Sequence, residues 1–249
     1  PIQGPYICKF VKDMGLDGVE LFQGDYEHSF PLSNPYIQDA YLEEKVKYGI
    51  EFSAVAVNCL DYYGITKPVD SPEKKVALLA LEKSVEIAKR MKLPLIQFPA
   101  FGESRIETEK DFQELVIFLR RACQLAGEAG IQVATENALS VKEDIRLIEE
   151  VGYPNLKIYM DTQNPYLNKG YFAPDMIREL GDRICEVHVK DGKEGELSAA
   201  LLGEGATSYY ESVKALCEIG YQGFVHLENY YDQPPMNHCD KDAIELMRQ

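Results

Sequence analysis

Ile184-Cys-Glu-Val-His-Val-Lys-Asp191 is a stretch in which apolar and polar residues alternate, and this alternation predicts a β-strand. The strand carries Glu186, His188 and Lys190 on one face. Helical sequences flank it, so we expect a parallel strand that is buried on both faces. The charged face therefore either pairs with other charges in the core or holds a ligand. We favour a ligand, because the chain has only 4 histidines. The opposite, apolar face consists of Cys185, Val187 and Val189.

The composition is that of a globular protein without an obvious polyanionic partner. With 249 residues, 45% of them hydrophobic, the chain can bury a large core, and no linker divides residues 1–249, which we expect to form a single domain. The net charge of −15 argues against nucleic acid and anionic membranes as partners. No segment resembles a membrane span or a signal peptide. The 6 cysteines form no Cys-x-x-Cys pair, which indicates reduced thiols in a cytoplasmic protein.

Strand-like and helical segments alternate along the whole chain. Strands are expected at residues 18–22, 51–57, 95–100, 131–137, 156–162, 184–191 and 223–229. Helices are expected to begin near Pro5, Pro35, Pro72, Thr108, Ser140, Pro174, Ser208 and Asn237.

This alternation predicts parallel strands with right-handed helical crossovers. A doubly wound open sheet fits the pattern, but a (β/α)8 TIM barrel that lacks its first strand fits it better. The sequence starts abruptly at Pro1 without a methionine. We therefore expect the first strand to lie upstream of this sequence.

The polar residues at the strand ends predict a metal site, because the carboxyl ends of barrel strands meet at one mouth. Three acids and one imidazole would repel one another or be poorly solvated there unless a cation lay among them. Three oxygen ligands with one nitrogen suit Mn²⁺, Mg²⁺ or Co²⁺, and Zn²⁺ stays open. Each residue alone could equally be a helix cap or a solvated strand end. The four residues come from four successive strands and are Glu136, Asp161, His188 and Glu228.

Five short motifs follow one another along the chain in an order that resembles a known family. They are Thr135-Glu136-Asn137, Met160-Asp161-Thr-Gln-Asn164-Pro165, Val187-His188-Val-Lys-Asp191, Leu202-Gly-Glu-Gly205 and His226-Leu-Glu228-Asn229. In order and spacing they resemble the xylose isomerase-like TIM barrel superfamily, which holds sugar isomerases and epimerases, inosose dehydratases and DNA-repair enzymes of the endonuclease IV type.

The resemblance to the ketose 3-epimerases of this superfamily implies roles for the four strand-end residues. All four would be metal ligands, and Glu136 and Glu228 would also be the acid/base pair. One glutamate removes a proton next to a carbonyl, giving a metal-stabilised enediolate, and the other returns a proton from the opposite face. An isomerase would return the proton to the neighbouring carbon.

Two positions depart from the epimerase pattern. Asn164 stands where those enzymes have a histidine, and Glu194 stands where they have a substrate-binding arginine. Asn164 could contact a sugar hydroxyl or only form a turn. Lys190 could hold an oxyanion or a phosphate, act as an acid in dehydration, or form a salt bridge to Glu228 or Glu20. The expected substrate contacts are Asn58, Asn137, Asn164 and Lys190.

Below the metal, the strand periodicity turns Glu186 and His226 inward on neighbouring strands. We expect His226 to support the site by a hydrogen bond near Glu186 or a ligand carboxylate, and not to bind the metal. The early loop with Phe22, Tyr26 and Phe30 could form an apolar wall or part of the interface of a homo-oligomer.

The leading hypothesis is a divalent-metal-dependent isomerase or epimerase of a small sugar or sugar derivative. The alternatives are a metal-dependent dehydratase of an inosose-like cyclic ketone and a non-catalytic sugar-binding barrel. A DNA-repair nuclease is disfavoured by the acidic charge and by Asn58 and Gln97, which stand where its additional histidine ligands would be.

Overall fold

The computed structural model describes residues 4–232 and 236–249. All strands described belong to one parallel sheet in which each strand pairs with the next one along the chain. The strands are β1 (Gly18–Phe22), β2 (Glu51–Ala56), β3 (Leu95–Pro99), β4 (Gln132–Glu136), β5 (Leu156–Asp161), β6 (Ile184–Val189) and β7 (Val225–Leu227). The predicted barrel architecture, with seven strands, is confirmed.

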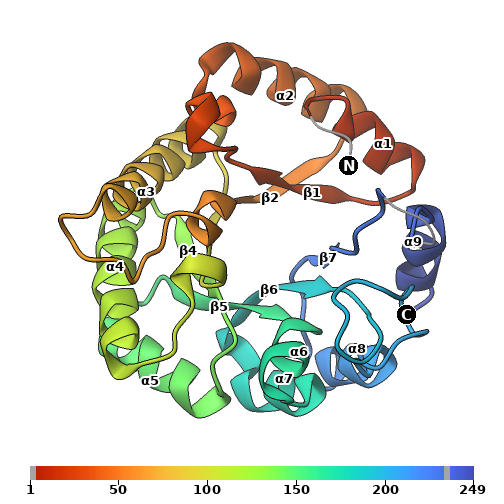
Figure 1. Cartoon of the computed structure of the whole chain (residues 1–249). Helices are drawn as coiled ribbons and strands as arrows, with labels where there is room; N and C mark the ends of the chain where they lie inside the picture. The colour runs from red at the N-terminus through yellow and green to blue at the C-terminus, as the bar shows by residue number, and fades with distance from the viewer. Residues whose placement is uncertain (1–3, 233–235) are drawn as a thin grey trace.

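Helices surround the ring of strands on the outside (Figure 1). They are α1 (Ile7–Asp13), α2 (Pro35–Tyr48), α3 (Pro72–Met91), α4 (Glu109–Gly127), α5 (Val141–Val151), α6 (Asn164–Lys169), α7 (Ala173–Leu180), α8 (Tyr209–Glu218) and α9 (Cys239–Met247). Side chains cap the starts of two long helices: at α3 the Ser71 side chain accepts from the Lys74 amide, and at α4 Thr108 and Asp111 form a reciprocal capping box. Among the described residues, no helix is long and apolar enough to cross a membrane.

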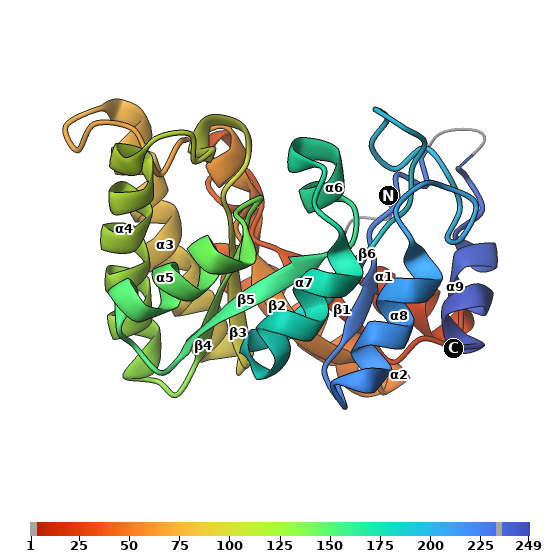
Figure 2. The ribbon, with the colours of Figure 1, turned by 90° about the horizontal axis from the view of Figure 1, so that it is seen from below.

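The expected one-to-one alternation is wrong at one place, because β5 is followed by two helices, α6 and α7. Helix α6 stands at the carboxyl end of β5 (Figure 2). It has only 6 residues, and it begins at Asn164-Pro165, where proline occupies the first turn. So short a helix leaves no apolar periodicity in the sequence. Its position matters because it brings Asn164 to the barrel mouth.

Strands β1 and β7 are the two edges of the sheet, and no backbone ladder joins them in the described part of the chain. Side chains cross the interior instead. The Ser53 hydroxyl of β2 lies 3.2 Å from Nε2 of His226 in β7, and Glu20 of β1 contacts His188 of β6. The barrel is thus held on this side by polar contacts through its centre.

The prediction that Cys185 shares an outward face with Val187 and Val189 is wrong. The pairing of β5 with β6 shifts between Ile158 and Tyr159, so that Cys185 is an extra residue on β6. This bulge turns Cys185 inward. There it packs against an interior apolar cluster at the amino-terminal end of the barrel, formed by Ala54, Leu95, Ala134 and Tyr159. The bulge restores the register, so Glu186 and His188 still point inward.

Candidate metal centre

The structure brings the four predicted ligand residues together at the carboxyl ends of neighbouring strands. Glu136 and Asp161 are the last residues of β4 and β5, His188 pairs with Asp161 in the β5–β6 register, and Glu228 directly follows β7. One ligand atom from each residue lies within 4.8 Å of the others. This spacing is short enough for one divalent ion to reach all four.

Two of these four residues present a buried polar atom that makes no hydrogen bond. Oδ1 of Asp161 accepts from the amides of Gln163 (2.7 Å) and Asn164, whereas Oδ2 makes no hydrogen bond and has only the Lys190 ammonium beside it, at 3.1 Å. Nδ1 of His188 makes no hydrogen bond either, although Glu136 and Glu228 lie 3.3 and 3.0 Å away. Buried polar atoms are rarely left unpaired in proteins. Three carboxylates and one imidazole that converge this closely fit a divalent cation of the Mn²⁺, Mg²⁺ or Zn²⁺ type.

Glu136 is held in place by two side-chain amides. Nε2 of Gln97 donates to Oε2 (2.7 Å), and Nδ2 of Asn164 donates to Oε1 (2.8 Å). Glu136 is buried, so these amides replace the water that would otherwise solvate its charge. Asn164 thus faces the site across the barrel mouth. Gln97 was visible in the sequence as a polar strand end, but no role was predicted for it.

His188 lies between three carboxylates. Nε2 is 3.1 Å from Glu20, and the ring packs on Tyr159 with centroids 4.4 Å apart. Burial alone would lower the pKa of His188, but the carboxylates of Glu228, Glu136 and Glu20 outweigh burial and raise it well above its ordinary value. Both ring nitrogens of His188 therefore face carboxylates.

Lys190 reaches into the same cluster from the residue that follows β6. Its Nζ lies 3.1 Å from Oδ2 of Asp161 and contacts Oε2 of Glu228. The salt bridge to Glu228 that the sequence left open is present, and Glu20 pairs with His188 instead. Burial alone would lower the pKa of Lys190, but Asp161 and Glu228 raise it well above its usual value. Burial raises the pKa of Asp161 to about 6 in spite of Lys190.

Beneath the cluster, Glu186 and His226 form the contact that the strand periodicity suggested. Nε2 of His226 lies 2.9 Å from Oε2 of Glu186, which also accepts from the Tyr159 hydroxyl (3.2 Å). Ser53 contacts the same imidazole nitrogen. These residues make a polar layer between the interior apolar cluster and the candidate metal ligands.

The remaining predicted contacts differ in where their side chains point. Asn137 uses both ends of its amide within the loop after β4: Oδ1 accepts from the Leu139 amide (2.7 Å), and Nδ2 donates to Asp144 of α5 (3.0 Å). Asn58 begins the short 3₁₀ helix after β2, and its buried Oδ1 has no hydrogen-bond donor. Their roles as substrate contacts stay predictions. The geometry favours Asn58 over Asn137.

Asp61 is a further residue at the mouth that was not predicted. It ends the 3₁₀ helix that Asn58 begins. Burial first, and then the charges of Glu136 and Glu228, raise the pKa of Asp61 to about 6. Its Oδ1 has no hydrogen-bond donor. The only sequence signal was an acid soon after a strand, which is common in solvated loops.

The buried Asp144 behind Asn137 gives a prediction for stability against pH. Burial raises its pKa from 3.8 to about 7, so the folded state holds this proton more tightly than the unfolded state. The contribution of Asp144 to the free energy of unfolding is therefore fully present below about pH 4, and it is lost as the pH rises towards 7. At about 1.4 kcal/mol per unit, Asp144→Asn should gain about 3 kcal/mol over the wild type between pH 5 and pH 8. Urea denaturation at both pH values measures this change.

Asp182, whose side chain is 95% exposed, provides the matched control. Asp182→Asn should leave the stability difference between the two pH values unchanged. An Asp144→Asn variant that follows the wild type at both pH values would contradict the argument.

The loop between β6 and α8 is organised by Asp191. Its Oδ1 accepts from the Gly192 and Thr207 amides and the Thr207 hydroxyl, and its Oδ2 accepts from the Gly203 and Gly205 amides, at 2.7–3.2 Å. A Cβ on Gly205 would lie 2.1 Å from this carboxylate, so only glycine fits there. The Leu202–Gly205 motif is therefore a carboxylate-binding turn.

Asp191→Ala should destabilise the protein by about 3–5 kcal/mol, because it leaves four backbone amides of the loop without an acceptor. Asp191→Asn keeps one acceptor oxygen and should lie between the alanine variant and the wild type. Urea denaturation gives the free energies, and limited proteolysis should locate new cleavage within residues 192–207. A loss below about 1 kcal/mol in Asp191→Ala would show that water replaces these bonds at little cost.

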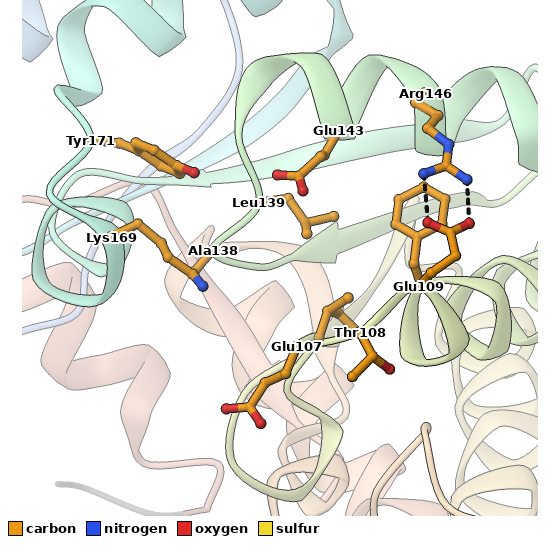
Figure 3. Close-up of a pocket in the computed structure, with 11 residues that line it drawn as sticks. Glu107, Thr108, Glu109, Ala138, Leu139, Glu143, Arg146, Lys169 and Tyr171 are labelled. Atoms are coloured by element: carbon orange, nitrogen blue, oxygen red, sulfur yellow. Dashed lines mark hydrogen bonds and ion pairs between the residues drawn. The ribbon is translucent and has the colours of Figure 1, made fainter.

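A pocket of about 190 Å³ lies between the start of α4, the loop after β4, the first turns of α5 and the end of α6 (Figure 3). The Arg146 guanidinium in this pocket forms an ion pair with Glu109 (Figure 3). It also pairs with Glu150 of the same helix. None of the four candidate ligands lines this pocket. It is therefore separate from the candidate metal centre.

This protein is thus a parallel β/α barrel that gathers three carboxylates and one imidazole, a candidate divalent-metal site, at the carboxyl ends of its strands. The chain belongs to the xylose isomerase-like TIM barrel family, whose model matches residues 8–249. The family resemblance inferred from the five motifs is confirmed.

Relatives of known activity are epimerases by name. A 2-epi-5-epi-valiolone 7-phosphate 2-epimerase from Actinoplanes sp. is 28% identical over 216 residues, which are 86% of this chain and 77% of that protein. A D-psicose 3-epimerase from Enterocloster bolteae is 32% identical over 92 residues, 37% of this chain and 29% of that protein. Among solved structures, D-psicose 3-epimerase from Clostridium cellulolyticum H10 with D-tagatose has a TM-score of 0.77 at 18% identity, covering 98% of this chain and 92% of that one.

Proposed function

We propose that this protein is a divalent-metal-dependent epimerase or isomerase of a small sugar or sugar derivative. The observation that carries the proposal is the placement of Glu136 and Glu228. Both carboxylates approach Nδ1 of His188, at 3.3 and 3.0 Å, and they come from different strands, β4 and the end of β7. Two carboxylates converging on one point can serve a carbon atom between them as base and acid. The epimerase names of the relatives support this reaction class.

Glu136, Asp161, His188 and Glu228 would hold the metal. Bound there, it supplies a Lewis acid that stabilises the enediolate formed when a proton leaves the carbon next to a carbonyl. Asp161 is suited to a pure ligand role, because its second oxygen is occupied by two amides. Glu136 and Glu228 are the proposed proton carriers. Gln97 and Asn164 orient Glu136 through donated hydrogen bonds, so its carboxylate is positioned before a substrate arrives.

The proposed substrate is polyhydroxylated because the side of the mouth nearest β1–β3 is rich in unpaired acceptors. Four buried oxygen atoms there accept no hydrogen bond, and a sugar hydroxyl can donate to each of them. Asn58, Asn164 and Lys190 are the proposed substrate contacts. The four atoms are Glu20 Oε1, Asn58 Oδ1, Asp61 Oδ1 and Gln97 Oε1.

Elemental analysis of the purified protein, followed by a deuterium-exchange assay, tests the proposal. The protein, loaded with Mn²⁺ and then with Mg²⁺, is incubated in D₂O with D-fructose, D-psicose, D-tagatose and their phosphate esters, and deuterium incorporation is followed by NMR. We expect one metal per chain and exchange next to the carbonyl of at least one ketose. Stoichiometric metal without exchange in any candidate would exclude the epimerase and isomerase proposal and favour a sugar-binding barrel.

A metal-dependent dehydratase of an inosose-like cyclic ketone is the second candidate. The Lys190 ammonium favours it, since a buried ammonium beside the acid/base pair could protonate a departing hydroxyl. Loss of water changes the substrate mass by one water and creates a conjugated carbonyl, whereas epimerisation changes neither. Mass spectrometry of the same reaction mixtures, with an inosose added to the substrates, separates the two reactions.

A further inference from the structure

Lys190 lies where a divalent ion would need its ligands. We propose that its ammonium is a resident cation that occupies the carboxylate cluster in the metal-free protein, and that metal binding displaces it into the barrel mouth, where it binds a substrate oxygen. This inference rests on the metal site of the proposed function. It assigns to Lys190 the coupling of metal loading to substrate binding.

The contacts show that Lys190 and a metal compete for the same oxygens. The Lys190 side chain is 5% exposed, and its Nζ touches Asp161 and Glu228, both candidate ligands. Asp161 has only Oδ2 left for coordination, because Oδ1 accepts from two backbone amides. Oδ2 is also the oxygen that lies 3.1 Å from Nζ of Lys190. A metal bound to it would lie next to the ammonium.

The charges explain why the Lys190 ammonium and a divalent metal ion cannot occupy the carboxylate cluster together. The cluster has three candidate ligand carboxylates, and the Lys190 ammonium contacts two of them, Asp161 and Glu228. A divalent ion on the same oxygens removes the attraction that keeps Lys190 buried and replaces it by repulsion at short range. The lysine side chain is long and flexible, so it can leave without a change in the backbone.

The local structure restricts the movement to the side chain. The Lys190 amide donates to Oγ1 of Thr162 (3.2 Å), and that hydroxyl donates to the Lys190 carbonyl (3.0 Å). Asn229 accepts from the next amide, that of Asp191 (3.1 Å). The backbone at the end of β6 is therefore fixed on both sides. The released ammonium pivots towards the mouth, where a substrate would lie over the metal ligands.

Lys190→Met tests the competition, with Lys74→Met as the matched control. Lys74 is an equally buried lysine whose Nζ contacts Glu114 (2.8 Å), but it lies on α3 and touches none of the candidate metal ligands. Mn²⁺ affinity is measured by calorimetry, and melting temperature is measured with and without Mn²⁺. We expect Lys190→Met to bind Mn²⁺ at least about tenfold more tightly than the wild type and to gain more melting temperature from it. Lys74→Met should lose stability at unchanged Mn²⁺ affinity.

Lys190→Arg serves as the second variant, because it keeps the charge and can hold two carboxylates with a rigid fork. It should bind Mn²⁺ no more tightly than the wild type. Equal or weaker Mn²⁺ binding by Lys190→Met would overturn the inference, even if the wild type exchanges protons as proposed. If Lys190→Met binds Mn²⁺ more tightly but no ketose exchanges, the displacement stands and the proposed reaction fails. If no variant binds Mn²⁺, the metal site fails together with this inference.

Discussion

Replacing Glu136 or Glu228 by glutamine is expected to slow proton exchange into the substrate by about 10²–10⁴-fold, the usual range for loss of a positioned acid or base. Glutamine has the shape of glutamate but cannot carry the proton. Either change alone should be sufficient for this loss in an epimerase, because the reaction needs one carboxylate on each face of the carbon. Deuterium incorporation into the ketose that the wild type exchanges is the measurement.

The substitution at Glu228 is easier to interpret than the substitution at Glu136. Glu136 accepts from the amides of Gln97 and Asn164, and a glutamine there would face these donors with its own NH₂ group. Metal content of each variant must therefore be measured beside the rate. Glu186→Gln is the matched control, since this carboxylate lies in the same barrel but contacts His226 and Tyr159. Full metal content with unchanged exchange in Glu228→Gln would remove Glu228 from the mechanism.

Asp161→Ala is expected to abolish stoichiometric metal binding and to lower the stability of the metal-free protein by about 3 kcal/mol, at the low end of what breaking a buried ion pair costs. The side chain is fully buried, and its loss leaves Lys190 with Glu228 alone. It also leaves the amides of Gln163 and Asn164 without their acceptor. Calorimetry with Mn²⁺ and urea denaturation measure the two effects.

Asp161→Asn separates the ligand role from the structural role. Asparagine keeps an oxygen that can accept from the amides at the start of α6, but it removes the charge that binds metal and Lys190. We expect Asp161→Asn to lose metal as Asp161→Ala does, while recovering part of the stability. Metal bound at full stoichiometry in both variants would show that Asp161 is not a ligand.

The barrel and the convergence of its strand ends could be predicted from the sequence because both depend on local patterns. Apolar periodicity located every strand, and parallel strands bring their carboxyl ends to one mouth whatever the loops do. The outward position of Cys185 was predicted wrongly because a bulge depends on how β6 pairs with β5. The pattern of residues within one strand does not determine its register against a neighbouring strand.

The partners inside the site were less predictable for a similar reason. The sequence left Lys190 with two candidate partners, Glu228 and Glu20, and the choice depends on how the side chains of three different strands pack together in the barrel. Gln97 was seen as a polar strand end, but its contact with Glu136 requires two side-chain conformations to agree. The five hydrogen bonds accepted by the Asp191 carboxylate come from residues up to 16 positions away, which meet only after the loop closes.

The start of α6 contacts the candidate metal centre directly. Its amides donate to Oδ1 of Asp161, and the cation at the centre binds Oδ2 of the same carboxylate. Replacing an ammonium by a divalent ion on Oδ2 changes the electron density on Oδ1, and hence the shielding of the two amide protons. Gln163 and Asn164 are thus built-in nuclear magnetic resonance probes of the centre. With a diamagnetic ion such as Mg²⁺, their resonances distinguish the lysine-bound from the metal-bound carboxylate without any knowledge of the substrate.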